Sequence, residues 1–150
     1  MDFQGGFHQR VAFVTKDGVQ TFDEIGDGIE TVVVTKDNKF RKAIIRKSDK
    51  KKRMTKITFR RGVFANTDTI VYAADDQLWP SAAREEQVLT SDLKIGSQLW
   101  SNTIGPPWEV AIVEPLDGEY DAWTVEIPGE DSFSLRNEIP ALSMEVRDEE

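Results

Sequence analysis

A strand, a glycine turn and a single helical turn follow one another in the stretch AFVTKDGVQTFDEIGDG, residues 12–28. Apolar and polar residues alternate with a period of two over residues 11–15, which is the pattern of a half-buried strand. Residues 16–18, Lys-Asp-Gly, form a turn sequence, because glycine adopts the positive φ that tight turns require. Residues 20–25 then predict one helical or 3₁₀ turn, which ends at Gly26 and is followed by a strand. This unit predicts a fold that is built from short, β-rich elements.

Strand-length segments recur along the rest of the chain and predict an all-β fold. Only residues 81–87 carry a run of good helix formers, with Ser81 as a plausible N-cap, and residues 89–95 predict another single turn before a glycine. Many short strands, separated by turns rich in Gly, Pro, Asp and Asn, are typical of mostly antiparallel architectures with one or two short helical turns. The expected strands, which are rich in β-branched and alternating residues, cover residues 30–35, 42–46, 56–60, 69–73, 98–100, 110–113 and 123–127.

The length and hydropathy of the chain indicate one water-soluble domain. A chain of 150 residues buries one sizeable core, so we expect a single domain over residues 1–150, with residues 1–5 as an N-terminal arm and residues 145–150 as an acidic, frayed tail. No apolar run approaches the roughly 20 residues that a membrane helix needs. The first ten residues carry no apolar secretory segment, so we expect a cytoplasmic location without membrane contact, and a monomer.

The residue types that are absent exclude several kinds of chemistry. The sequence has no cysteine, which excludes disulfides, thiolate nucleophiles and cysteine-based zinc sites. His8 is the only histidine, so we expect no metal site and no cofactor. A Ser-His-Asp triad would have to use His8, which we expect to lie in a mobile N-terminal segment.

Basic residues are concentrated in residues 39–61, although the net charge of the chain is -8. This segment holds twelve of the nineteen Lys and Arg residues, including the run Lys50, Lys51, Lys52 and Arg53. One interpretation is a solvated hairpin tip between two strands. The other is a patch that contacts the phosphates of a nucleic acid, although the acidic remainder of the chain opposes binding of a polyanion.

Four sequence phrases together resemble the Hedgehog/intein (Hint) family of splicing domains. Residues 12–28 resemble the opening strand and turn of inteins, and residues 67–80, TDTIVYAADDQLWP, resemble the family's second conserved block. Residues 89–100, LTSDLKIGSQLW, are similar to a strand entry of this family, and residues 118–143 resemble the two C-terminal blocks. The resemblance implies a horseshoe of short strands that brings both ends of the domain together.

The residues that start splicing in this family are missing from the upstream positions. Splicing needs a nucleophile at the upstream junction and polar groups that polarise the peptide bond there. The resemblance places the family's first-residue Cys or Ser on or near Gly6, its block threonine on Ala74 and its block histidine on Gln77. An amide donates a hydrogen bond but cannot carry a proton near neutral pH.

The residues that complete splicing are missing downstream as well. The family's final His-Asn pair falls on Leu142 and Ser143, and its acceptor nucleophile falls on Met144. A histidine that is common before the last strands is replaced by Asp131. Only Asp121 matches an acidic residue of the family, and a lone aspartate at a strand end or turn is as well explained by hydrogen bonds to the backbone.

Three functions follow from this comparison. The first is a degenerate Hint domain without splicing activity, which acts as a structural or binding module inside a host protein, for example one encoded by a phage, with an unidentified protein partner. The second is an active self-processing element whose nucleophile is Ser143 or Thr103. The third is a nucleic-acid-binding β-domain that uses residues 39–61.

Overall fold

The computed structural model describes residues 3–35, 37–62, 68–82, 87–100, 106–129 and 132–143. Within these ranges the helical elements are short: α1 (Phe22–Ile25) and the 3₁₀ turns η2 (Thr90–Asp92) and η3 (Arg136–Glu138). The strands are β1 (Ala12–Thr15), β2 (Gly18–Thr21), β3 (Glu30–Val34), β4 (Phe40–Lys47), β5 (Met54–Arg61), β6 (Thr69–Ala74), β7 (Leu78–Pro80), β8 (Gln87–Leu89), β9 (Trp108–Pro115), β10 (Trp123–Glu126), β11 (Ser132–Ser134) and β12 (Pro140–Leu142).

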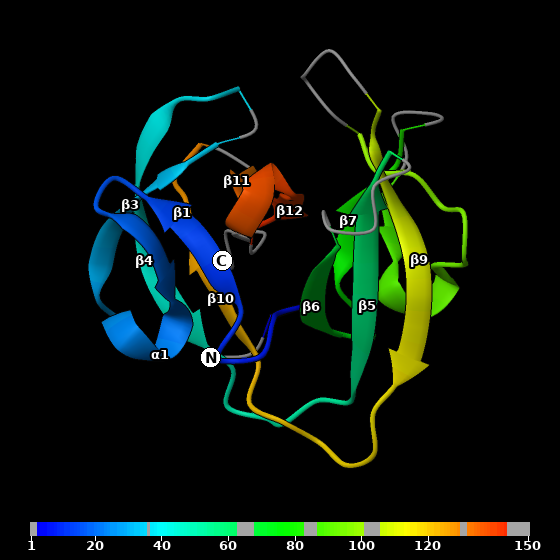
Figure 1. Cartoon of the computed structure of the whole chain (residues 1–150). Helices are drawn as coiled ribbons and strands as arrows, with labels where there is room; N and C mark the ends of the chain where they lie inside the picture. The colour runs from blue at the N-terminus through cyan, green and yellow to red at the C-terminus, as the bar shows by residue number, and fades with distance from the viewer. Residues whose placement is uncertain are drawn as a thin grey trace.

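The strands form two groups that lie side by side (Figure 1). One is a five-stranded sheet with the order β10-β4-β3-β1-β2, and the other is a three-stranded sheet with the order β6-β5-β9. Two smaller pairs, β7-β8 and β11-β12, complete the described part of the fold. All of these strand pairings are antiparallel, which confirms the prediction of an all-β, mostly antiparallel fold.

The segment from Gly6 to His8 joins the two sheets. Phe7 pairs with Trp123 of β10, since each backbone N–H donates to the other residue's carbonyl at 2.8 Å or less. On its other side the same segment pairs with β6: the His8 N–H donates to the Tyr72 carbonyl at 3.0 Å, and the Ala74 N–H donates to the Gly6 carbonyl at 2.9 Å. A short piece of chain near the N-terminus therefore bridges β10 of one sheet and the C-terminal half of β6 in the other.

Aromatic side chains fill the core at this junction. The ring of Phe7 is fully buried and meets Trp79 and Phe133 edge to face, with centroids 5.7 Å and 6.0 Å apart. Phe13 of β1 and Phe22 of α1 lie in the same cluster, with centroids 4.6 Å apart. Edge-to-face pairs of this kind add to the stabilisation from buried apolar area. This cluster fixes the position of the N-terminal segment.

Most of the predicted strands are present, and two predicted elements are wrong. Residues 98–100 do not form a strand, because Gln98 and Leu99 make only isolated bridges. Residues 81–87 are not a helix at their ends, because Ser81 bridges to Leu99 and Gln87 begins β8, while residues 83–86 lie outside the described ranges. The short strands β2, β7, β8, β11 and β12 were not predicted, and all but β2 have only three residues.

The basic residues 50–53 do not form a hairpin tip. Strand β4 pairs with β3 and β10, whereas β5 pairs with β6 and β9. The segment between β4 and β5 therefore crosses from one sheet to the other (Figure 1). Alternating residues predict a strand but do not identify its partner, which is why adjacent strands were wrongly expected to pair.

No helix among the described residues is both long enough and apolar enough to span a lipid bilayer.

Candidate functional site

The candidate site lies where the N-terminal segment, the end of β6 and the end of β12 meet. Gln77 occupies the centre, directly after the turn that ends β6, and its backbone N–H donates to the Ala74 carbonyl at 3.0 Å. Its side chain is almost completely buried. A buried amide needs hydrogen-bond partners, because an unsatisfied polar group in the interior is costly.

The Gln77 amide is held by backbone groups from both boundary segments. Its Oε1 accepts a hydrogen bond from the Gly6 N–H at 2.7 Å. Its Nε2 donates to the carbonyl of Leu142 at 3.1 Å and to that of Leu78 at 2.8 Å. The position that resembles the family's upstream junction and the position just before its downstream junction are thus joined through one side chain.

Gly6 has no room for a side chain. Its φ is +119°, a region that residues with a Cβ rarely adopt. A Cβ at this position would lie 2.8 Å from the Cβ of Ala122 and 3.3 Å from the backbone nitrogen of Trp123. The neighbouring Gly5 has a φ of +84°, and a Cβ there would overlap the Gln77 side chain. The conformation of both residues therefore depends on glycine.

Among the other family positions that the structure describes, Ser143 and Asp121 are the ones that carry a polar side chain. Ala74 is fully buried, pairs with Met54 of β5, and bonds through its backbone to Gly6 and Gln77. Leu142 ends β12 and presents its carbonyl to Gln77, and Ser143 follows it directly. Asp131, Met144 and the alternative nucleophile Thr103 lie outside the described residues.

Asp121 lies just before β10, and its carboxylate is 3.6 Å from the ammonium group of Lys47. Burial lowers the pKa of His8, and Asp121 is one of the charges that oppose this shift. Its described ion pair is with a lysine of the neighbouring strand β4, so the structure gives Asp121 a role in holding β10 against β4.

The Lys52 side chain bonds to the N-terminal segment and is mostly buried. Its ammonium group donates to the carbonyls of Phe3 and Gly5 and forms an ion pair with Asp76 at 3.1 Å. Only 17% of its side chain is exposed. Of the four basic residues predicted as a solvated tip or a phosphate-binding patch, Lys52 therefore serves neither purpose, whereas Lys50, Lys51 and Arg53 are exposed.

His8 does not lie in a free N-terminal segment, contrary to expectation. Its backbone N–H is bonded to Tyr72, and its ring packs against the rings of Tyr72 and Tyr120 with centroids 5.9 Å and 5.8 Å away. Burial lowers the pKa of His8, and the nearby Arg10 lowers it further. Within the described ranges, no group of three or more His, Cys, Asp or Glu residues is placed to hold a metal ion.

Sequence reasoning missed the amide bridge and the environment of His8. The bridge involves the backbone of Gly6 and Leu142, and backbone partners leave no signal in residue type. A glycine pair at residues 5–6 followed by an apolar residue was the only available hint. The packing of His8 against Tyr72 and Tyr120 joins residues far apart in the chain, which no local pattern reveals.

Comparisons with known proteins establish the fold. No known family model matches the sequence, and no curated protein matches it. Among solved structures, the gp41-1 intein is similar over 93% of this chain and 98% of its own, with 20% identity and a TM-score of 0.70. The Ssp DnaB mini-intein variant M86 matches over 99% of both chains, with 10% identity and a TM-score of 0.71. A bacterial intein-like domain from Clostridium thermocellum matches over 95% of this chain and 99% of its own, with 13% identity and a TM-score of 0.67. The predicted Hint-like fold is confirmed.

Proposed function

We propose that this domain, which has the intein fold, no longer splices and serves as a structural module inside a longer host protein. The observation that carries the proposal is the buried amide of Gln77, which joins Gly6 to Leu142 by hydrogen bonds. In an active splicing domain the two boundaries are cut and their flanks are joined. Here the same two regions are tied together by a neutral side chain that has no proton to transfer near neutral pH.

The upstream boundary lacks a group that could attack a peptide bond. An acyl shift requires a hydroxyl or thiol on the first residue of the domain, with its oxygen or sulfur next to the preceding carbonyl. Gly6 carries neither group, and the Cβ that would carry one meets Ala122 and the backbone of Trp123. Both hydrogen-bonding groups of the Gly6 backbone are already used, by Ala74 and Gln77.

The downstream boundary lacks a group that could cut itself. Cyclisation by an asparagine requires a side-chain amide nitrogen that attacks the residue's own carbonyl. Ser143 has a hydroxyl in place of that amide, and Leu142 has no group that could protonate a leaving nitrogen. The chemistry is therefore absent at both ends, and the proposed role is to hold the ends together. We propose a phage-encoded host protein, and the genomic context of the reading frame tests that part.

A fusion with flanking domains tests the loss of splicing. The chain is placed between an N-terminal maltose-binding protein and a C-terminal thioredoxin, and the purified fusion is incubated and followed by electrophoresis and mass spectrometry. We expect only the full-length fusion at every time point. A fusion that carries an active mini-intein between the same partners is the positive control. Cleaved or ligated products from the chain itself would overturn the proposal.

Two sets of variants make the result specific. Gly6→Cys restores a nucleophile at the upstream boundary, and we expect it to remain uncleaved because the side chain has no space there. If the parent fusion does cleave, Ser143→Ala and Thr103→Ala identify which hydroxyl acts. Loss of cleavage in either variant would establish the alternative function, a self-processing element with a displaced nucleophile.

A further inference from the structure

The N-terminal segment pairs with β6 only over residues 6–8 and then turns away from it. Phe7 lies opposite Ala73 in an antiparallel bridge, and the bonds from His8 to Tyr72 and from Ala74 to Gly6 flank that bridge. If the segment continued, its next facing pair would involve Val71. Instead the chain turns, since the Val11 N–H bonds back to the His8 carbonyl at 2.9 Å. Among the residues that the structure describes, none pairs with the rest of β6 on this side.

The uncovered edge of β6 carries backbone groups that are ready to pair. In an antiparallel ladder the N–H and C=O of one residue point to the same side, and successive residues alternate. Tyr72 and Ala74 direct their groups towards the N-terminal segment, so Ile70 directs its groups to that side as well. His8 occupies the place opposite Tyr72, whereas within the described ranges no residue bonds to the N–H and C=O of Ile70 on this edge. An edge of this kind is a template for another strand.

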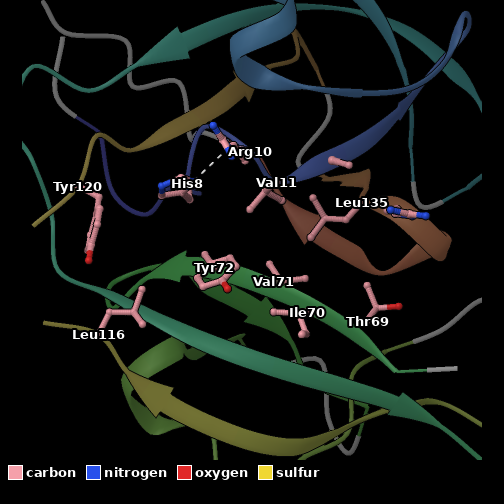
Figure 2. Close-up of a pocket in the computed structure, with 12 residues that line it drawn as sticks. His8, Arg10, Val11, Thr69, Ile70, Val71, Tyr72, Leu116, Tyr120 and Leu135 are labelled. Atoms are coloured by element: carbon pink, nitrogen blue, oxygen red, sulfur yellow. Dashed lines mark hydrogen bonds between the residues drawn. The ribbon is translucent and has the colours of Figure 1, made fainter. Parts of the chain in front are cut away.

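A pocket of about 500 Å³ lies alongside this edge (Figure 2). Residues 69–72 of β6 form one wall, and Val11 and Leu135 face them from the opposite side. Its volume falls within the range of about 300–1,000 Å³ that is usual for ligand sites. At about 3.3 Å per residue, the wall formed by residues 69–72 is roughly 10 Å long, which accommodates three or four residues of an extended chain.

The charge of the pocket is opposite to that of the molecule. Its lining contains Arg10 and Arg136 but no Asp or Glu, although the chain has 27 acidic residues and a net charge of -8. Neither arginine side chain has an ion-pair partner among the residues that the structure describes. His8 adds no full charge at neutral pH, because its pKa is lowered. Two unpaired guanidinium groups beside free backbone groups favour carboxylates.

We propose that this pocket binds an extended acidic peptide of a partner protein as an additional antiparallel strand on β6. One guest residue faces Ile70 and pairs with both its N–H and its C=O, and the next guest residue faces Val71. Arg10 and Arg136 hold carboxylates of the guest. Strand addition to a sheet edge supplies affinity through the backbone, and the side-chain contacts select the sequence. The inference does not depend on whether the domain splices.

A binding measurement with a short blocked peptide tests the proposal. The probe is an acetylated, amidated and fluorescently labelled Glu-Val-Glu-Thr-Glu peptide, titrated with the full chain and followed by anisotropy. We expect saturable binding and shifts of the Ile70 and Tyr72 amide signals in nitrogen-proton correlation spectra. A Lys-Val-Lys-Thr-Lys peptide is expected not to bind. A version that is N-methylated at alternate amides keeps its charge but loses backbone donors, and we expect it to bind at least about tenfold more weakly, or about 1.4 kcal/mol.

Variants and competitors decide among the remaining explanations. Arg10→Gln and Arg136→Gln are each expected to weaken binding, and Ile70→Pro is expected to abolish it by removing an edge N–H without removing a bond to β5. Circular dichroism checks that each variant folds, and the two arginine variants keep the test intact if the proline variant does not. The matched control is Lys50→Gln with Lys51→Gln, which removes charge outside the pocket. Equal weakening by the control, equal binding of the N-methylated peptide, or full competition by free glutamate or inorganic phosphate would each overturn the proposal.

Discussion

Gln77 is the residue on which the junction of the two boundaries depends. It uses both hydrogens of its amide and accepts the Gly6 N–H, so each of its partners would lose a hydrogen bond in the interior if the side chain were truncated. We expect Gln77→Ala to lower the free energy of unfolding by about 1–3 kcal/mol, because buried donors and acceptors are left unsatisfied. Urea unfolding followed by tryptophan fluorescence measures the change. Gln87→Ala, at an exposed position of β8, is the matched control and should be close to neutral; an equal effect in both variants would refute the role of the amide.

His8 gives the folded chain a dependence on pH that a single substitution should remove. Burial lowers its pKa, and Arg10 acts in the same direction, while Asp23 and Asp121 oppose it and the rings of Tyr72 and Tyr120 lie against it. A base with a lower pKa in the folded state binds its proton more readily when unfolded. The contribution of neutral His8 to the free energy of unfolding is therefore fully present above its unfolded pKa of 6.5. It is lost as the pH falls through the lower pKa of the folded state.

We expect His8→Phe to have a flatter stability profile than the parent chain between about pH 8 and about pH 5.5. His8 is the only histidine, so few other groups titrate in this interval. Midpoints of urea unfolding across that range, compared between the two proteins, give the result. A parent chain whose stability rises as the pH falls through this interval would contradict the sign of the shift.

At the scale of elements, the sequence predicted strands better than their partners. Period-two alternation located β1, β3, β4, β5, β6, β9 and β10 to within a few residues, because that pattern arises from one buried face. It failed for β11 and β12, whose residues are all buried and so do not alternate. It also failed to show that β4 and β5 lie in different sheets, since pairing depends on contacts between residues that are distant in sequence.

Two buried threonines, Thr90 and Thr124, differ in whether their hydroxyl groups are hydrogen-bonded. This difference predicts opposite effects on the free energy of unfolding when each is replaced. The Thr90 hydroxyl, in η2, accepts the indole N–H of Trp79 at 2.8 Å and donates to the Gln77 carbonyl at 3.2 Å. The Thr124 hydroxyl, in β10, is buried and has no hydrogen-bond partner within the described part of the chain. Replacement of threonine by valine keeps the shape and removes the hydroxyl. The effect on stability should therefore depend on whether the hydroxyl is bonded.

We expect Thr90→Val to lower the free energy of unfolding by about 1–3 kcal/mol, because the indole N–H of Trp79 loses its acceptor in the interior. We expect Thr124→Val to be neutral or to raise it by up to about 1 kcal/mol, since it removes an unsatisfied polar group from a strand that favours valine. Thermal and urea unfolding of both variants measure the difference. Equal losses in the two variants would show that the hydrogen bond from Trp79 does not hold β7 against η2.

At the scale of the whole molecule, the order of the sequence phrases predicted the fold although each phrase resembles the family only loosely. Solved inteins share 20% identity or less with this chain in the comparisons above, yet they match it over more than nine tenths of its length. Alternation, glycine turns and apolar positions survive such divergence because they fix the backbone. The site could not be predicted in the same way, because the Gln77 side chain bonds to backbone groups of Gly6 and Leu142, and Lys52 bonds to backbone carbonyls of the N-terminal segment.

The closeness of the two boundaries predicts that the domain can be inserted into another protein without separating the host's chain ends. Gly6 and Leu142 both bond to one side chain, so a host loop that is interrupted by the domain would re-enter near the point where it left. We expect a β-lactamase with the chain inserted into an exposed surface loop to keep most of its activity and its thermal stability. The same insertion with Gln77→Ala should lose activity at a lower temperature, because its boundaries are held less firmly. An inactive reporter that contains a folded domain, shown by the tryptophan fluorescence of that domain, would contradict this arrangement of the ends.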